Sequence, residues 1–231
     1  MLFRSASVGD NNQNSGNPDL RPEKIWSSLV GVEKRWGKRG VLNASLVQEN
    51  FTDQLTLVPT GNGGVALGNV RDAKRWGYDL SWTLPLAVIL DGLELTGYYR
   101  WRTSELVDPI TYQSRPFSGW NGRQLNADIV YEIPAKKLRM GAWIWRGDNG
   151  SEYRPDQKYN WQTHQTWAAW VETKAYKNLT IEFGIQDLFG NTFRRIRTDY
   201  APDRRSGNIS QTQFRQRSLD GTWYLVIKGT I

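Results

Sequence analysis

The feature that most constrains this fold is an alternation of apolar and polar residues through segments that are longer than ordinary strands. Residues 92–103 show it on both parities, with one face carrying Leu93, Leu95, Gly97, Tyr99 and Trp101, and the other Glu94, Thr96, Tyr98, Arg100 and Arg102. Successive side chains of a β-strand point to opposite faces, so this pattern predicts a strand with one apolar and one polar face. Strands in globular proteins usually end after about 5–6 residues, whereas a tilted strand that crosses a bilayer needs about 9–11.

The same alternation predicts nine long strands, at residues 25–35, 41–55, 72–84, 92–103, 120–132, 138–148, 163–174, 179–188 and 219–231. Short connections alternate with long ones: the short ones are 36–40, 85–91, 133–137 and 175–178, and the long ones are 56–71, 104–119, 149–162 and 189–218. A bacterial outer-membrane barrel has short periplasmic turns and long extracellular loops, whereas a soluble meander has no reason to sort its loops. The sequence therefore predicts an all-β, antiparallel transmembrane β-barrel segment that is open along both edges.

Hydropathy and composition agree with strands, and not helices, in the membrane. The longest apolar run, residues 84–90, is far shorter than the roughly 20 residues of a spanning helix, and residues 1–16 lack the apolar core of a secretory signal. A mean hydropathy of −0.62 is also what a barrel gives when every second residue faces a polar lumen. The chain has no Cys and a single His164, which excludes a disulfide scaffold and a multi-histidine metal site.

The 12 Trp and 10 Tyr residues exceed what a soluble core needs, and their positions predict two interfacial aromatic belts. The belt at the long-loop end is predicted to contain Trp26, Trp76, Trp101, Trp120, Trp145, Trp161 and Trp223, and the other belt Trp36, Trp82 and Tyr131. Alternation in residues 138–145 makes Trp143 and Trp145 point into the lumen unless a bulge shifts the register, and both alternatives stay open. The competing interpretation packs the aromatic residues in the core of a β-sandwich.

Three short motifs in this framework resemble those of TonB-dependent outer-membrane receptors. GNPDLRPE at 16–23 is similar to the lead-in to a strand of their 22-stranded barrel, LTIEFGIQDLFG at 179–190 resembles the penultimate strand, and GTWYLVIKGTI at 221–231 resembles the last. The motif residues are Asn17, Pro18, Leu20, Pro22, Glu23, Asp187, Leu188, Phe189 and Ile231. The resemblance assigns residues 1–24 to the end of an extracellular loop with an extended lead-in, and residues 25–231 to the C-terminal barrel strands.

Departures from the family pattern lead us to expect a fragment. Members end in an aromatic residue, whereas this chain ends in Ile231, and the family's N-terminal plug domain and TonB-engaging box have no counterpart in the sequence. Nine strands is also an odd number, whereas single-chain bacterial barrels have an even one. We therefore expect about the last nine strands of a larger, 22-stranded barrel.

The resemblance implies active transport across the bacterial outer membrane of a scarce ligand such as a ferric siderophore, cobalamin or an oligosaccharide. Energy would come from the TonB system through the missing N-terminal part, and the other partners would be outer-membrane lipid, lipopolysaccharide and the small-molecule ligand. No catalytic residue, metal site or cofactor is expected, and the scattered basic residues form no nucleic-acid-binding motif. The alternative is a non-catalytic carbohydrate-binding β-protein that uses its Trp residues as sugar platforms.

The formal net charge of +7 is compatible with an anionic ligand. A guanidinium binds anionic groups bidentately, so the arginines of the last long connection are candidate ligand-binding residues: Arg194, Arg195, Arg197, Arg204 and Arg205. Arg100 and Arg102, beside Trp120, form a second candidate patch. In the alternative reading, the arginines belong to a solvated loop and pair with nearby aspartates and strand carboxylates.

Overall fold

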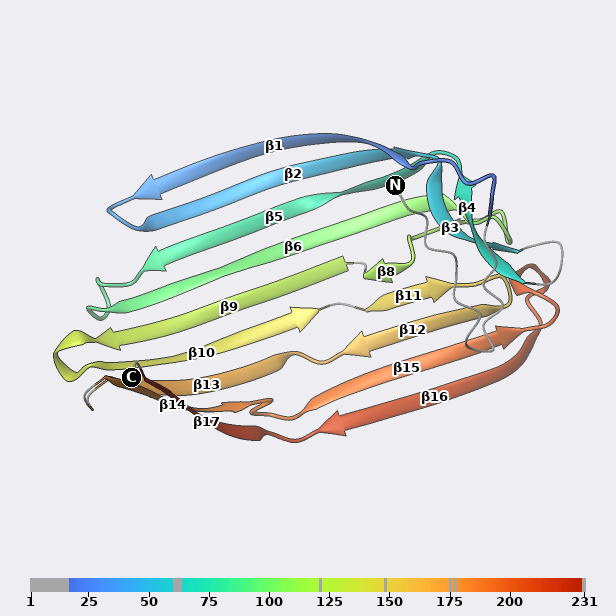
Figure 1. Cartoon of the computed structure of the whole chain (residues 1–231). Helices are drawn as coiled ribbons and strands as arrows, with labels where there is room; N and C mark the ends of the chain where they lie inside the picture. The colour runs from blue at the N-terminus through green and yellow to red at the C-terminus, as the bar shows by residue number, and fades with distance from the viewer. Residues whose placement is uncertain are drawn as a thin grey trace.

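The computed structural model describes residues 17–59, 64–120, 122–147, 149–174, 176 and 178–229. Its main sheet is an antiparallel meander in the order β1-β2-β5-β6-β9-β10-β13-β14-β17, with β1 and β17 at the edges (Figure 1). These strands are β1 Lys24–Trp36, β2 Gly40–Thr52, β5 Ala73–Pro85, β6 Leu93–Val107, β9 Gly122–Ile133, β10 Leu138–Gly147, β13 Thr166–Thr173, β14 Leu179–Gln186 and β17 Thr222–Gly229. The predicted nine-strand meander is confirmed.

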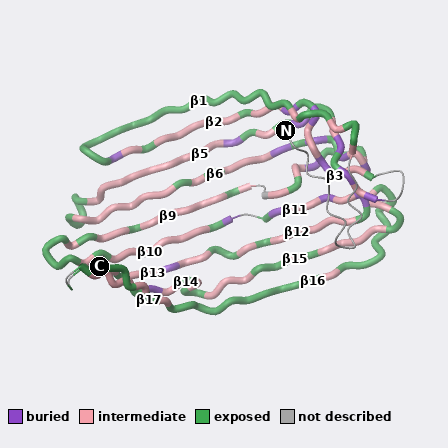
Figure 2. Tube along the Cα trace, in the orientation of Figure 1, coloured by how far each residue is buried: buried purple, intermediate pink, exposed green. Residues whose placement is uncertain are grey.

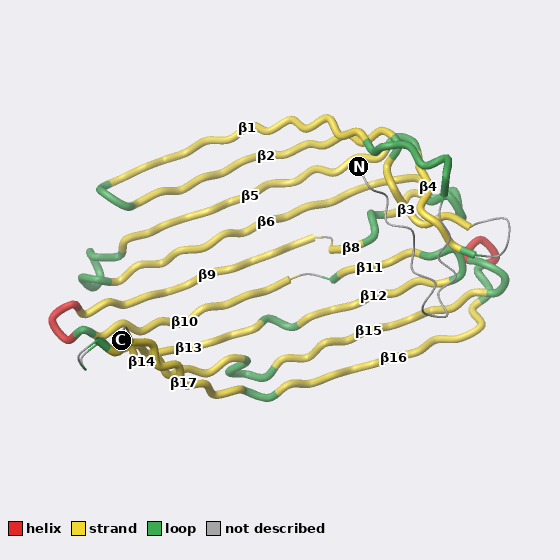
Figure 3. The backbone as a smooth tube through the Cα atoms, viewed as in Figure 1, coloured by secondary structure: helices red, strands yellow, loops and turns green. Residues whose placement is uncertain are grey.

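The long connections contain strands that the sequence analysis assigned to loops. β3 (Gln54–Pro59) and β4 (Val65–Val70) form a hairpin, and β7 (Ser114–Arg115) pairs with the end of β6. A second sheet has the order β16-β15-β12-β11-β8, from β8 Gly119–Trp120, β11 Gly150–Tyr153, β12 Gln157–Thr163, β15 Asn191–Tyr200 and β16 Ile209–Leu219. Figures 1 and 3 show β11 and β12 continuing the lines of β10 and β13. The loop prediction was wrong there because the wall extends beyond its apolar band.

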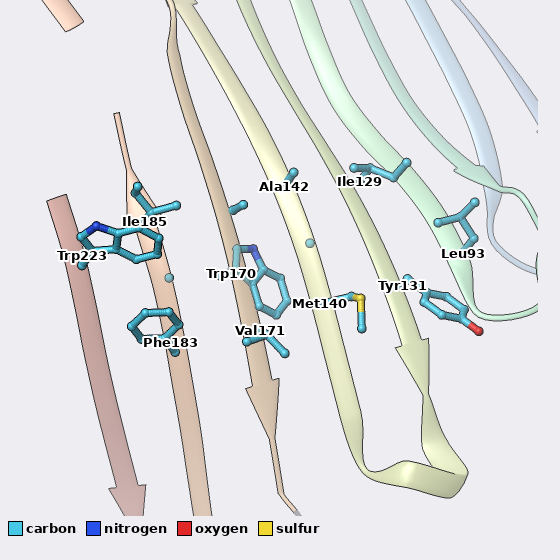
Figure 4. Close-up of a pocket in the computed structure, with 13 residues that line it drawn as sticks. Leu93, Ile129, Tyr131, Met140, Ala142, Trp170, Val171, Phe183, Ile185 and Trp223 are labelled. Carbon is cyan, nitrogen blue, oxygen red and sulfur yellow. The ribbon is translucent and has the colours of Figure 1, made fainter. Parts of the chain in front are cut away.

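The strand register gives the main sheet one apolar and one polar face. One row across the sheet consists of Leu95, Ile129, Ala142, Ala169, Ile185 and Trp223, and the adjacent row of Thr96, Asp128, Trp143, Ala168, Gln186 and Thr222. The apolar face carries a shallow groove of about 590 Å³, lined from β6, β9, β10, β13, β14 and β17 (Figure 4). In a transmembrane barrel the apolar face meets lipid and the polar face lines the lumen.

This register also orients the tryptophans. β9 and β10 pair without a bulge, so Trp143 and Trp145 lie on the polar face beside Asp128 and Asn126. Apolar-face parity is shared by the predicted belt residues Trp26, Trp76, Trp101, Trp223, Trp36, Trp82 and Tyr131. Thr163 lies next to Trp145 and therefore on the polar face. Trp161 is two residues from Thr163 on β12, so its side chain points to the same face. The prediction that Trp161 belongs to the lipid-facing belt was wrong. The side chain of Trp120 lies outside the described part of the chain.

Buried residues gather at the long-connection end (Figure 2), where the β3–β4 hairpin covers the polar face. Phe51, Ala73 and Leu106 form a buried cluster against which Val70 and Phe117 pack. The rings of Phe51 and Phe117 meet edge to face, with their centroids 5.1 Å apart. This small core fixes the hairpin to the wall.

The lead-in motif also holds the β3–β4 hairpin. The Asn17 side chain donates a hydrogen bond to the Leu67 carbonyl at 2.9 Å, and the backbone N–H of Leu55 donates to the Glu23 carboxylate at 3.0 Å. Pro18 and Pro22 keep this segment from forming a helix, and Leu20 lies between them. The motif thus acts as an extended brace for the hairpin.

The connection between β14 and β15 is a tight turn. At the Asp187-Leu188-Phe189-Gly190 motif, the Gly190 N–H donates to the Asp187 carbonyl at 2.7 Å, and the Phe189 ring meets Trp167 edge to face at 5.9 Å. Ile231, the last motif residue, lies outside the described residues.

The described chain has two 3-10 turns, η1 Pro134–Lys136 and η2 Arg204–Ser206. Within that part, no helix has the length and apolarity needed to cross a membrane.

Candidate functional site

A pocket of about 330 Å³ lies on the polar face of the second sheet, at the long-connection end. We term it the mouth pocket, and it is lined by Glu152, Arg154, Tyr159, Trp161, Phe193 and Arg195. The register places Glu152 opposite Tyr159 and Trp161 opposite Arg195. Directly opposed residues have Cβ atoms about 4.5–5.5 Å apart, so pairing of β11, β12 and β15 brings these side chains together.

Arg195 is the cation of the mouth pocket that has no acidic partner among the described residues. Its guanidinium lies 5.6 Å from the centre of the Tyr159 ring. Arg154, by contrast, donates a hydrogen bond to Glu152 at 2.7 Å and lies 5.7 Å from the same ring. A guanidinium has five N–H donors in a planar fork, so Arg195 retains donors for a bidentate contact with an anionic group.

The indole of Trp161 lies over Gly150, its neighbour across the β11–β12 pair. A Cβ atom at Gly150 would come within 2.1 Å of the indole ring, so any side chain there would displace Trp161. Trp161 and Glu152 also line an adjoining cavity of about 580 Å³ between the β3–β4 hairpin and the wall. The mouth pocket therefore opens onto a larger space that is covered by the hairpin.

A buried ion cluster, here termed the loop clamp, ties the long connections together. Its centre is Asp108, which has an exposed fraction of 0%. The Asp108 carboxylate accepts hydrogen bonds from Arg115 and, at 2.7 Å, from Arg204. The backbone N–H groups of Ile110 and Thr111 also donate to it, at 2.8 and 3.0 Å. The carboxylate is therefore paired with two cations and two backbone donors.

The loop clamp connects β3, the connection around residue 108, β11 and η2. Arg115 donates to the Thr56 hydroxyl in β3 at 3.0 Å, and Arg204 donates to the Arg154 carbonyl at 2.5 Å. The Tyr153 ring lies 4.3 Å from the Arg115 guanidinium and 5.5 Å from that of Arg204. Because Arg154 also lines the mouth pocket, the clamp positions one wall of that pocket.

The hydrogen bonds of the clamp change the acidity of Asp108. Burial disfavours the charged carboxylate, but hydrogen bonds from the Thr111 backbone, Arg204, the Ile110 backbone and Arg115 outweigh it, so the pKa of Asp108 lies below its ordinary value. A carboxyl group with a lower pKa in the folded state contributes stability that is fully present above its unfolded pKa, about 3.9. That stability is lost as the pH falls through the folded pKa.

We therefore expect the loop clamp to hold at neutral pH and to weaken only when the pH falls below about 4. The measurement is hydrogen exchange at the Ile110 and Thr111 amides of the full receptor in detergent, corrected for the intrinsic pH dependence of exchange. Their protection should fall between about pH 4 and pH 2. Unchanged protection over that range would contradict the assigned role of the Asp108 carboxylate.

The candidate arginines of the 189–218 segment do not form one patch. Arg195 lines the mouth pocket, whereas Arg194 lies on the opposite face of β15 and donates to Gln216 at 3.1 Å. The other three are engaged with the protein itself: Arg197 with Asp199 at 2.9 Å, Arg204 with Asp108 at 2.7 Å, and Arg205 with the Ile110 carbonyl at 2.9 Å. Of the five, Arg195 is the one that lines a pocket and has no acidic partner among the described residues.

The second candidate patch lies on the polar face of β6. Arg100 and Arg102 share the carboxylate of Asp79, at 2.9 and 2.6 Å. The backbone of Trp120 pairs with Gly150 in the second sheet. Arg100 and Arg102 thus form an ion-paired part of the wall.

Sequence reasoning missed several lining residues of the mouth pocket and the centre of the loop clamp. Tyr159 and Phe193 lie in segments predicted as loops, although their shared parity with Trp161 and Arg195 was readable in the sequence. Asp108 gave no comparable pattern, because its partner Arg204 is 96 residues further along the chain.

A curved antiparallel wall with a lipid-type face, a polar face and its long connections at one end defines a transmembrane β-barrel protein. The family model described as TonB dependent receptor-like, beta-barrel, matches residues 2–184. The chain therefore belongs to the TonB-dependent receptor β-barrel family, a family of outer-membrane transport receptors and not of enzymes. A comparison with curated proteins gave no match.

Proposed function

We propose that this chain forms part of an outer-membrane receptor that imports a ferric siderophore carrying anionic aromatic groups, energised through TonB. The observation that carries the proposal is the mouth pocket, where Arg195, which has no acidic partner among the described residues, meets Tyr159, Trp161 and Phe193. A catecholate chelate of iron has a negative charge for the guanidinium and aryl faces for the rings. Family membership favours this receptor over the alternative carbohydrate-binding module.

The proposal places the remaining partners on other surfaces. The apolar face would contact lipid, and Lys24, Lys74 and Arg146 are exposed on the same parity toward its long-connection end, where they would meet lipopolysaccharide phosphates. Contact with TonB would be made by parts of the receptor other than residues 1–231. The ligand would enter from the end that carries the mouth pocket.

Replacing Arg195 with Gln should weaken binding of a ferric tris-catecholate about 10- to 100-fold, because a hydrogen bond to a charged group contributes about 1.5–3 kcal/mol. The measurement is isothermal titration of the full receptor in detergent with ferric tris(2,3-dihydroxybenzoate). A neutral ferric tris-hydroxamate should bind more weakly and respond little to Arg195→Gln.

The matched control is Arg35→Gln, which removes an exposed arginine at the short-turn end of β1. It should leave catecholate affinity unchanged. Equal affinity for the charged and neutral iron complexes, with no effect of Arg195→Gln, would overturn the proposed ligand class. Saturable binding of cobalamin or an oligosaccharide instead would assign a different ligand to the receptor.

A further inference from the structure

A second groove, of about 330 Å³, lies on the polar face of the main sheet and shares no lining residue with the mouth pocket. It is lined by Asn126 and Asp128 of β9, Trp143 and Trp145 of β10, and Thr166 of β13. Trp143 stands opposite Asp128, and Trp145 stands opposite both Asn126 and Thr166. Trp143 and Trp145 are two residues apart on one strand, so their attachment points are about 7 Å apart.

Most polar groups of this groove are not engaged by another described residue and can bind a ligand. Asn126, Asp128, Trp143 and Trp145 make no side-chain hydrogen bond, ion pair or ring contact with another described residue. The Thr166 hydroxyl accepts a hydrogen bond from Asn191 at 3.0 Å. The groove therefore presents two indole faces, a carboxylate and a carboxamide that have no partner in the described part of the chain.

At two other places on the polar face, the combination of an aromatic ring and a carboxylate includes an arginine. Arg139 lies 5.1 Å from the Trp170 ring and stands opposite Glu172 in the register. At the other place, the guanidinium of Arg75 lies 5.4 Å from the Phe51 ring and 2.5 Å from the Glu49 carboxylate. The groove of Trp143 and Trp145 has the ring and the carboxylate but no cation among its described lining residues.

We propose that this groove binds a guanidinium group, which stacks on Trp143 and Trp145 and donates hydrogen bonds to Asp128 and Asn126. A cation over an indole is attracted by the negative face of the ring, and Trp is the strongest of the aromatic partners. The planar fork of a guanidinium also matches the geometry of a carboxylate. An uncharged aromatic ligand in the groove would instead leave the charge of Asp128 without a partner. The guanidinium comes from an arginine elsewhere in the receptor or from a free ligand.

The test uses the full receptor in detergent, labelled with 5-fluorotryptophan and observed by fluorine NMR. Trp143→Phe and Trp145→Phe assign the two resonances. The probes are N-acetylargininamide and N-acetylcitrullinamide, which differ only in carrying a guanidinium or a neutral urea. The substitution is Asp128→Asn, and its control is Asp91→Asn in the exposed connection before β6.

If the guanidinium is supplied by a ligand, the arginine probe should shift both resonances saturably and bind at least about tenfold tighter than the citrulline probe. Asp128→Asn should remove that preference. If an arginine of the receptor already fills the groove, neither probe should act, but Asp128→Asn should shift both resonances while Asp91→Asn does not.

Two outcomes overturn the proposal. One is equal affinity for the arginine and citrulline probes. The other is a pair of resonances that respond neither to the probes nor to Asp128→Asn. The probe comparison uses the unsubstituted receptor, so it stands even if Asp128→Asn fails to fold. An intact mouth pocket, measured with the catecholate probe, separates failure here from failure of the proposed uptake function.

Discussion

Replacing Asp108 with Asn is expected to open the loop clamp and to destabilise the long-connection end by about 3–5 kcal/mol, because breaking a buried ion pair leaves uncompensated charge. The side chains of Arg115 and Arg204 are each 7% exposed, so neither regains much hydration when the carboxylate is lost. Asn has nearly the same shape and keeps one oxygen for the Ile110 and Thr111 amides. The loss is therefore one of charge and not of packing.

The measurement for Asp108→Asn is limited trypsin digestion of the full receptor in detergent, with fragments identified by mass spectrometry. Cleavage after Arg204 and Arg205 should become fast, while the main sheet stays resistant. The control is Glu33→Gln, which removes one partner of the exposed Arg35 pair and should change nothing measurable. If the bonds after Arg204 and Arg205 remain as resistant as in the unsubstituted receptor, the clamp does not hold the loops.

The main sheet could be predicted from sequence because the membrane imposes a strict pattern on it. Residues 93–102 alternate between an apolar and a polar face, and the structure places them in β6, with lipid-type side chains on one face. The pattern fades where the wall leaves the apolar band. In β15, Phe193, Arg195 and Arg197 share one parity and Arg194, Ile196 and Thr198 the other, so both faces carry charge and the segment resembles a polar loop.

The candidate sites were harder to predict, since they depend on parity and on distant partners more than on composition. Counting arginines in the 189–218 segment gave one basic patch, whereas strand pairing sends Arg194 and Arg195 to opposite faces and turns Arg204 toward Asp108. The orientation of Trp143 and Trp145 was readable from alternation alone, but only the unbroken β9–β10 register excludes a bulge.

Replacing Gly77 with Val is expected to prevent assembly of the barrel wall. Gly77 stands opposite Arg102 in the β5–β6 pair, and a Cβ atom there would lie 1.9 Å from the Trp101 carbonyl oxygen and 3.0 Å from the Arg102 Cα. Both are backbone atoms, so no side-chain rotation can relieve the overlap and the two strands must separate. Backbone groups left unpaired in hydrocarbon cost several kcal/mol each.

The readout for Gly77→Val is heat-modifiable migration of the full receptor on a denaturing gel, together with its amount in the outer membrane. Both should be lost, since a gap in the middle of the sheet exceeds the 4–5 kcal/mol that marks the severe end of single substitutions. The matched control is Gly31→Ala in β1, where the added Cβ would lie 3.4 Å from its nearest neighbours, at ordinary contact distance. That variant should migrate like the unsubstituted receptor. A folded, heat-modifiable Gly77→Val receptor would mean that β5 and β6 pair less closely than the register requires.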